Sequence, residues 1–282
     1  MQPLHPEGRP FDLDRAAPDA VAALLAEFAI AAGPAVMEVY AGAAGVSAKA
    51  DGSPVTLADE RAEAIICRHL AEVLPGIPVV AEEMTAAGRR ISIGRRFVLV
   101  DPLDGTKEFI TRNGEFTINV ALIQAGRPIA GAVYAPVLAR LWFGGDHAFV
   151  CDLPVGAALP APPAWRPIRA RAAPESLVVL ASRSHADAAT EAFLARLPVA
   201  DRRAAGSSLK FCLVAEGLAD VYPRFGPTME WDTAAGDAVL RAAGGVVLDS
   251  SGAPLAYGKI GADLRNGSFV AWGDPAAAAR FQ

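Results

Sequence analysis

The stretch Asp101-Pro102-Leu103-Asp104-Gly105-Thr106-Lys107-Glu108-Phe109 directly follows the apolar run Phe97–Val100. We expect the run to form a buried strand that brings two aspartates, three residues apart, to one end of a sheet. Pro102 restricts the turn and Gly105 permits backbone conformations that other residues avoid, so the two carboxylates can converge. Carboxylate oxygens and the Leu103 carbonyl are hard ligands of the kind that Mg²⁺ takes. An ordinary turn is the structural alternative, because Asp, Pro and Gly are common turn residues.

Two further acidic segments stand at the borders of predicted elements. Glu82 and Glu83 follow the apolar run Ile77–Ala81. Successive side chains of an extended chain point in opposite directions, so we expect only Glu82 to face a common site. Asp232 precedes the helical pattern Thr233–Ala243, at a position where an aspartate is a good N-cap. A solvated loop for the glutamates and simple helix capping for Asp232 are the structural alternatives.

Two more polar positions open predicted helices. Asp59 lies in the first turn of a helix expected over Thr56–Leu74, where a favourable interaction with the helix dipole is as good an explanation as catalysis. Ser207 and Lys210 belong to a Gly-Ser-Ser-x-Lys loop that leads into another helix. The charge and backbone amides of such a loop suit a phosphate group.

The composition limits the classes of function. The 282 residues include 26 Lys and Arg against 31 Asp and Glu, a net charge of −5, which offers no general attraction for nucleic acid polymers. The three cysteines are far apart and only four histidines are present, which argues against a zinc or iron–sulfur centre of the soft-ligand type, so we expect any metal site to use mainly oxygen. Scattered thiols suit a reducing compartment, and we expect a cytoplasmic protein.

The chain divides into three parts by composition. We expect a mobile arm over residues 1–18, an α+β unit over 19–153 and an α/β unit over 154–282, with the proline-rich stretch Leu153–Pro167 at the boundary. The apolar window Val21–Val39 contains Glu27 and Glu38 and repeats with helical period, so we expect a core helix and no membrane-spanning segment. The other expected elements are helices over 186–196, 209–216 and after Asp274, and strands over 117–123, 129–134, 140–143, 177–181, 220–222, 245–248 and 268–271.

Taken together, these motifs identify a family. Their order and context resemble the metal-dependent, lithium-sensitive phosphomonoesterases that include inositol monophosphatases and fructose-1,6-bisphosphatases. The closer resemblance is to bacterial 3'(2'),5'-bisphosphate nucleotidases, where Gly-Thr-Lys-Glu-Phe follows the aspartate pair, as at 105–109, instead of the Gly-Thr-Thr-Asn-Phe of inositol monophosphatases. The other matching stretches are Ser182-Arg183-Ser184-His185, Gly206-Ser207-Ser208-Leu209-Lys210-Phe211 and Tyr222-Pro223-Arg224-Phe225-Gly226-Pro227-Thr228.

The resemblance implies a layered αβαβα sugar-phosphatase fold and a set of roles. Asp59 and Thr106 would orient and deprotonate a water, with the Thr106 hydroxyl donating to Asp59. Two or three Mg²⁺ ions would be held by Glu82, Asp101, the Leu103 carbonyl, Asp104 and Asp232. The substrate would be contacted by Gly105, Thr106, Ser182, His185, Ser207, Lys210 and Asp232. The implied reaction is hydrolysis of the 3'-phosphate of adenosine 3',5'-bisphosphate to AMP and phosphate.

Two other functions stay open at this point. An enzyme similar to inositol monophosphatases would act on inositol or sugar phosphates, although Lys107 and Glu108 count against it. A non-catalytic module would bind Mg²⁺ or nucleotide for regulation, although every predicted ligand position is intact. Oligomeric state, and peripheral association with the inner membrane, are also left open.

Overall fold

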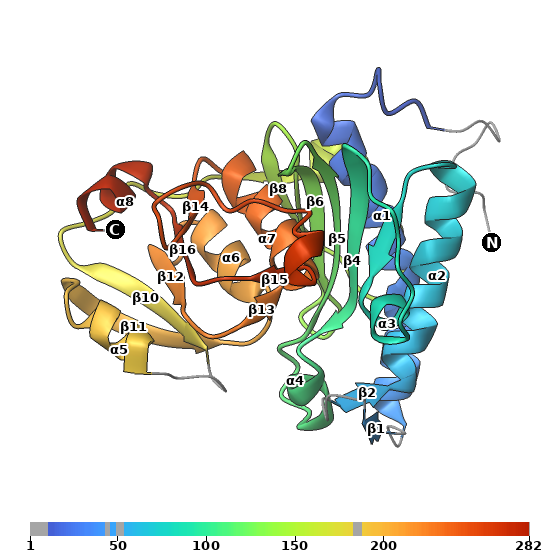
Figure 1. The fold of residues 1–282 in the computed structure, drawn as a ribbon, viewed down its shortest axis with the longest axis horizontal. Helices are drawn as coiled ribbons and strands as arrows, with labels where there is room; N and C mark the ends of the chain where they lie inside the picture. Colours follow the sequence, from blue (N-terminus) through green and yellow to red (C-terminus); the bar gives the residue numbers. More distant parts are fainter. Residues whose placement is uncertain (1–10, 43–45, 49–53, 183–187, 282) are drawn as a thin grey trace.

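A large mixed sheet forms the middle of the molecule (Figure 1), and its strand β4 carries Asp101 and Asp104. The structure is a computed structural model that describes residues 11–42, 46–48, 54–182 and 188–281. Within these residues the sheet has seven strands, mostly antiparallel, with only the β3–β4 pair parallel. In spatial order they are β3 (Val79–Ala81), β4 (Arg96–Asp104), β5 (Thr117–Gln124), β6 (Arg127–Ala135), β7 (Arg140–Gly144), β8 (Ala148–Asp152) and β9 (Arg166–Ile168).

Two long helices cover one face of this sheet. They are α1 (Pro18–Ala41) and α2 (Leu57–Val73), which pack on Val98 and Val100 of β4. The alternate residues Phe97 and Leu99 belong to a second core on the opposite face. Because β4 is buried on both faces, its apolar run is continuous instead of alternating with polar residues.

The second core holds a helical layer between two sheets (Figure 1). Its helices are α6 (Leu209–Ala215) and α7 (Glu230–Ala242). Within the described chain, the second sheet has five strands in the order β11 (Val199–Ala205), β10 (Leu177–Ser182), β12 (Val221–Arg224), β16 (Phe269–Trp272) and β14 (Val246–Asp249). A third core packs α5 (Ala188–Leu194) and α8 (Pro275–Phe281) against its outer face. The predicted αβαβα layering is confirmed.

Short elements complete the fold. They are the helices α3 (Glu82–Ala86) and α4 (Thr106–Ile110), the strand pairs β1 (Val46–Ala48) with β2 (Pro54–Thr56) and β13 (Thr228–Met229) with β15 (Arg265–Asn266), and the 3₁₀ turns η1 (Pro162–Ala164) and η2 (Ile260–Ala262). The pair α3 and α4 matters most, because α3 begins with Glu82 directly after β3, and α4 begins two residues after Asp104, the last residue of β4.

Helix α1 is a core helix of this protein. It is long and apolar enough to cross a membrane by length and composition alone, but 61% of its most apolar window is buried inside the protein. Gly33 allows the close approach of the sheet, because a Cβ there would lie 2.7 Å from Cε1 of Tyr134. The buried face of α1 is therefore shaped to fit this sheet.

The structure shows contacts that cross the boundaries of the three expected parts. Residues 1–10 of the expected arm lie outside the described residues, whereas Phe11 donates its N–H to the Val73 carbonyl at 3.0 Å and packs on the first core. The strand β9 follows residue 153 but is an edge strand of the first sheet. Helix α7 likewise packs against the first sheet. The two expected units thus share a layer, and their boundary stays a prediction.

Candidate active site

The aspartate pair lies at an irregularity where β4 ends. Asp101 pairs with Asn119 of β5, whereas the next paired residue is Asp104, opposite Thr117. The intervening residues leave the ladder, and Asp101 Oδ1 accepts the Leu103 N–H at 3.1 Å. The irregularity and this local hydrogen bond distort the end of β4, so that both carboxylates come from one short segment of the strand.

Gly105 makes the following turn possible. It precedes α4 with φ +94°, the left-handed region that glycine tolerates. A Cβ there would also lie 3.3 Å from the Glu115 carbonyl and 3.4 Å from Glu108 Oε2. The prediction that Gly105 permits an unusual backbone conformation is confirmed, and its use by substrate stays a prediction.

A cavity of about 300 Å³ gathers most of the predicted residues. Glu82 at the start of α3, Asp104 at the end of β4 and Asp232 in the first turn of α7 all line it. The other predicted residues in its wall are Gly105, Thr106, Ser207 and Lys210, together with Arg224. Residues from segments more than a hundred positions apart therefore meet at the junction of the two sheets.

The acidic residues influence one another electrostatically. Burial raises the pKa of Asp101 well above its usual range, and Glu82, Asp104 and Asp232 raise this pKa further. The pKa of Asp232 is raised in the same way, first by burial and then by Asp104 and Glu82. No described Lys, Arg or His side chain forms an ion pair with Asp101, Asp104 or Asp232.

This donor set fits a hard cation. Four carboxylates and the buried Leu103 carbonyl supply only oxygen, which Mg²⁺ prefers. Ionised carboxylates are costly to bury unless they are paired, and a divalent cation would supply the missing charge. In the described part of the chain, no three Asp, Glu, His or Cys side chains already form a closed metal-binding group. The charge and donor atoms of the cluster suit Mg²⁺, but its carboxylates are not yet arranged around a single ion position.

Asp232 corrects one prediction. Helix α7 begins at Glu230, so Asp232 is its third residue and the N-cap position belongs to Met229. Asp232 Oδ2 accepts the Met229 N–H at 2.8 Å. The prediction that Asp232 is the N-cap is therefore wrong: its carboxylate bonds the N-cap N–H from the third position of the helix.

Asp59 and Thr106 form hydrogen bonds with different partners. Asp59 is fully buried, and its Oδ2 accepts both the N–H (2.8 Å) and the hydroxyl (2.7 Å) of Thr56, which caps α2. The Thr106 hydroxyl donates to the Leu103 carbonyl at 3.5 Å. Among hydrogen bonds between described residues, the expected donation from Thr106 to Asp59 is absent. Asp59 thus belongs to a capping box with Thr56, which the sequence analysis did not predict, and its role as a base stays a prediction.

Among the predicted substrate residues, Ser207 and Lys210 are described by the structure, whereas His185 and the side chain of Ser182 lie outside the described residues. Ser207 has φ +52° and donates its hydroxyl to Asp104 Oδ2 at 2.8 Å. Lys210 is buried, and its Nζ donates to the carbonyls of Ala205 (3.1 Å) and Ser207 (2.6 Å). Burial lowers the Lys210 pKa to about 8, against the attraction of Asp104.

Three supporting residues were not predicted. Asn119 is buried in β5 and donates to Ser208 Oγ (3.0 Å) and to Asp104 Oδ2 (3.4 Å). Glu115 accepts the Gly206 N–H at 2.8 Å, which joins the two sheets beside the cavity. Glu63 of α2 accepts two N–H groups of α3. A polar residue inside the apolar run of β5 was the available signal for Asn119, because buried polar groups are kept for their hydrogen bonds.

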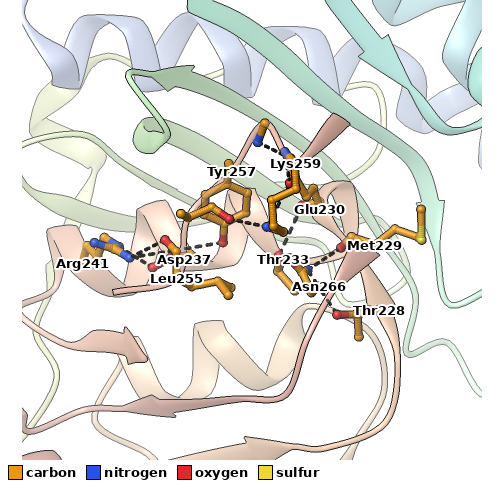
Figure 2. A network of polar contacts seen from close by, with 12 residues as sticks. Thr228, Met229, Glu230, Thr233, Asp237, Arg241, Leu255, Tyr257, Lys259 and Asn266 are labelled. Atoms are coloured by element: carbon orange, nitrogen blue, oxygen red, sulfur yellow. Dashed lines mark hydrogen bonds and ion pairs between the residues drawn. The ribbon is translucent and has the colours of Figure 1, made fainter. Parts of the chain in front are cut away.

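A polar network holds the helix that carries Asp232 (Figure 2). The buried Glu230 carboxylate accepts the N–H groups of Gly258 (2.6 Å) and Lys259 (2.8 Å). Asn266 donates to the Met229 carbonyl (2.8 Å) and to the Thr233 hydroxyl (3.0 Å). The segment 254–266 is thereby fixed to the first turn of α7, which positions Asp232 at the cavity.

Comparisons with known proteins agree with these features. A sequence model described as the inositol monophosphatase family matches residues 17–279. The 3'(2'),5'-bisphosphate nucleotidase CysQ of Escherichia coli O157:H7 is 49% identical over 235 residues, covering 80% of this chain and 89% of the relative. CysQ of Buchnera aphidicola is 39% identical over 243 residues, covering 83% and 86%.

A solved structure gives the same result. The crystal structure of CysQ from Bacteroides thetaiotaomicron, titled a bacterial member of the inositol monophosphatase family, superposes with a TM-score of 0.75 at 38% identity. The superposition covers 90% of this chain and 97% of that one. The family inferred from the sequence motifs is thus confirmed by sequence and by fold, and this chain belongs to the inositol monophosphatase family.

Proposed function

We propose that this protein is a 3'(2'),5'-bisphosphate nucleotidase that hydrolyses the 3'-phosphate of adenosine 3',5'-bisphosphate to AMP and phosphate. The observation that carries the proposal is the cavity at the sheet junction, where Glu82, Asp104 and Asp232 face the basic residues Lys210 and Arg224. The names of the relatives support the nucleotide substrate. An acidic cluster beside basic groups suits a phosphate ester whose charge is shared between a cation and the chain.

Mg²⁺ would be held by Glu82, Asp101, the Leu103 carbonyl, Asp104 and Asp232, and we infer two or three ions. When bound, the metal supplies positive charge for the phosphate oxygens and lowers the pKa of a bound water. The chain prepares for this by burying Asp101 to 1% exposure and by holding Asp104 with the Ser207 hydroxyl. Such support keeps ligand oxygens in place before the ion arrives.

Asp59 and Thr106 would orient the attacking water and take its proton. Asp59 is held rigidly by Thr56, and Thr106 follows Gly105 at the cavity wall. A general base needs correct placement within hydrogen-bond reach of the proton more than unusual basicity.

Substrate selection is assigned to the second sheet and its loops. Lys210 would attract a phosphate, while Ser207, Gly105 and the Asp232 carboxylate would contact the nucleotide in the same cavity. Ser182 and His185 are proposed as nucleotide contacts on the strength of the matching motif alone. We infer a cytoplasmic enzyme, since the cysteines Cys67, Cys151 and Cys212 are unpaired thiols.

The proposal is tested by a substrate panel. Phosphate release is measured from adenosine 3',5'-bisphosphate, its 2',5' isomer and inositol 1-phosphate, each with Mg²⁺ and with chelator. We expect kcat/KM to be highest for a bisphosphate nucleotide, and release to stop with chelator. A higher kcat/KM for inositol 1-phosphate would refute the substrate, and release that continues with chelator would refute the metal.

The Ser207→Ala variant separates two roles of one side chain. If Ser207 mainly holds Asp104, the variant needs more Mg²⁺ for half-maximal rate. If it mainly contacts the nucleotide, KM for the nucleotide rises at saturating Mg²⁺. We expect the first effect, of about tenfold, because the hydroxyl of Ser207 already bonds Asp104.

A further inference from the structure

The buried side chain of Glu63 caps a helix to which it does not belong. Its Oε2 accepts the Glu83 N–H at 2.7 Å, and its Oε1 accepts the Met84 N–H at 2.9 Å. Glu83 and Met84 are the second and third residues of α3, whose N–H groups have no partner within a helix. Ala81 precedes α3 and has no side-chain oxygen with which to cap it. Glu63 on α2 therefore caps the N-terminus of α3 in place of a local side chain.

The position of Glu63 links two parts of the site. It lies four residues after Asp59, so both side chains project from the same face of α2. Asp59 is fully buried and Glu63 is 6% exposed. Burying a carboxylate is costly unless it is hydrogen-bonded, and the two N–H groups of α3 provide that bonding. One face of α2 thus carries the proposed base and the support of the next helix.

We propose that Glu63 is a positioning residue for the metal site. Glu82, the first residue of α3, is covalently joined to the turn that Glu63 holds, and Glu82 faces Asp104 and Asp232 in the cavity. Glu63 itself does not line that cavity. It acts by fixing the direction of α3 and hence of the Glu82 carboxylate. The inference rests on the proposed function, because the role of Glu82 as a metal ligand is part of that proposal.

Two conservative variants remove the cap in different ways. In Glu63→Gln the shape is kept, but an amide has a single acceptor oxygen and its NH₂ group opposes one of the two N–H donors. In Glu63→Asp the charge is kept, but the carboxylate is one methylene further from α3. Glu72→Gln is the matched control, since Glu72 is an exposed acid on the same helix with its Oε2 3.9 Å from His69 Nδ1.

The test measures Mg²⁺ binding directly. Metal-free full-length protein is titrated with Mg²⁺ by calorimetry at pH 8, above the Glu63 pKa of about 7 that burial produces. We expect the Kd for Mg²⁺ to rise about tenfold in both Glu63 variants and to stay unchanged in Glu72→Gln. Phosphate release by the Glu63 variants should recover when Mg²⁺ is raised by the same factor.

The outcomes separate the inference from the function it rests on. Circular dichroism and thermal melting establish which variants are folded before binding is measured. A folded Glu63 variant that binds Mg²⁺ as tightly as the unaltered protein overturns the positioning role, whatever its melting temperature. Absence of Mg²⁺ binding by the unaltered protein would instead refute the proposed metal site.

Discussion

Two buried aspartates illustrate how the chain handles negative charge. Asp237 in α7 is fully buried, and it accepts hydrogen bonds from Arg241 Nε (2.5 Å) and the Tyr257 hydroxyl (2.9 Å), as Figure 2 shows. Asp101 in β4 is 1% exposed and accepts the Leu103 N–H, with other carboxylates around it. Burial raises the pKa of both, but Arg241 and Tyr257 lower that of Asp237 whereas the neighbours of Asp101 raise it further.

The contrast separates a structural acid from a binding acid. The countercharge of Asp237 is part of the chain, so its network is complete without any ligand. The countercharge of Asp101 is not supplied by a described side chain, so a cation from solution would complete it. If the distinction holds, removing the two charges must have opposite consequences for stability and for metal binding.

The largest effect is expected for Asp101→Asn. Loss of a ligand should lower kcat/KM by about 1000-fold, because a metal contributes several kcal/mol to such reactions. The same variant should be at least as stable as the unaltered protein without Mg²⁺, since one repelling charge is gone. Thermal melting with and without Mg²⁺ and phosphate release measure both effects.

Asp152→Asn is the control for this prediction, because Asp152 is an exposed residue of β8 away from the cavity. It should leave both readouts unchanged. A strong loss of stability in metal-free Asp101→Asn would contradict the view that the acidic cluster repels itself.

Asp237→Asn should have the opposite profile. The change leaves Arg241 without its charged partner in a site where Arg241 is only 15% exposed. Breaking a buried pair costs about 3 kcal/mol, so the urea midpoint should fall clearly. The Kd for Mg²⁺, measured on folded protein, should stay within twofold of the unaltered value. A weakened Mg²⁺ site with normal stability would show that Asp237 belongs with Asp101 instead.

The same contrast explains what could be predicted from the sequence. The carboxylates proposed as ligands follow apolar runs, so local pattern singled out Glu82, Asp101 and Asp104 as candidates. Their supporting contacts join distant segments: Glu115 bonds Gly206, and Glu63 bonds α3 from another helix. No local pattern reports such a contact, because each partner is an ordinary polar residue in its own segment.

Element boundaries were also limited by non-local contacts. The strand over 97–100 was predicted, but β4 continues to Asp104 because its backbone still pairs with β5 where the apolar run has ended. Helix α7 begins before Thr233 because Glu230 is buried and bonded to Gly258. Strand β11 was not predicted, since it is an exposed edge strand with a polar sequence.

A third acid, Glu27, is neutralised by protonation. Glu27 of α1 is partly buried, and burial raises its pKa from 4.5 to about 7, so a proton takes the place of a metal or an arginine. A carboxyl with a raised folded-state pKa binds its proton more tightly when folded. Its contribution to stability is therefore full below pH 4.5 and is lost as the pH rises to about 7. Glu27→Gln should abolish this loss.

The expected gain for Glu27→Gln is about 1 kcal/mol at pH 8 and near zero at pH 4.5, after allowance for solvent screening of a partly exposed group. Urea unfolding at the two pH values measures it, with the exposed Glu38→Gln in the same helix as control. Equal effects at both pH values would mean that Glu27 is already ionised in the folded protein. Mg²⁺ binding should not change, because Glu27 lies in α1 and does not line the cavity of the proposed metal site.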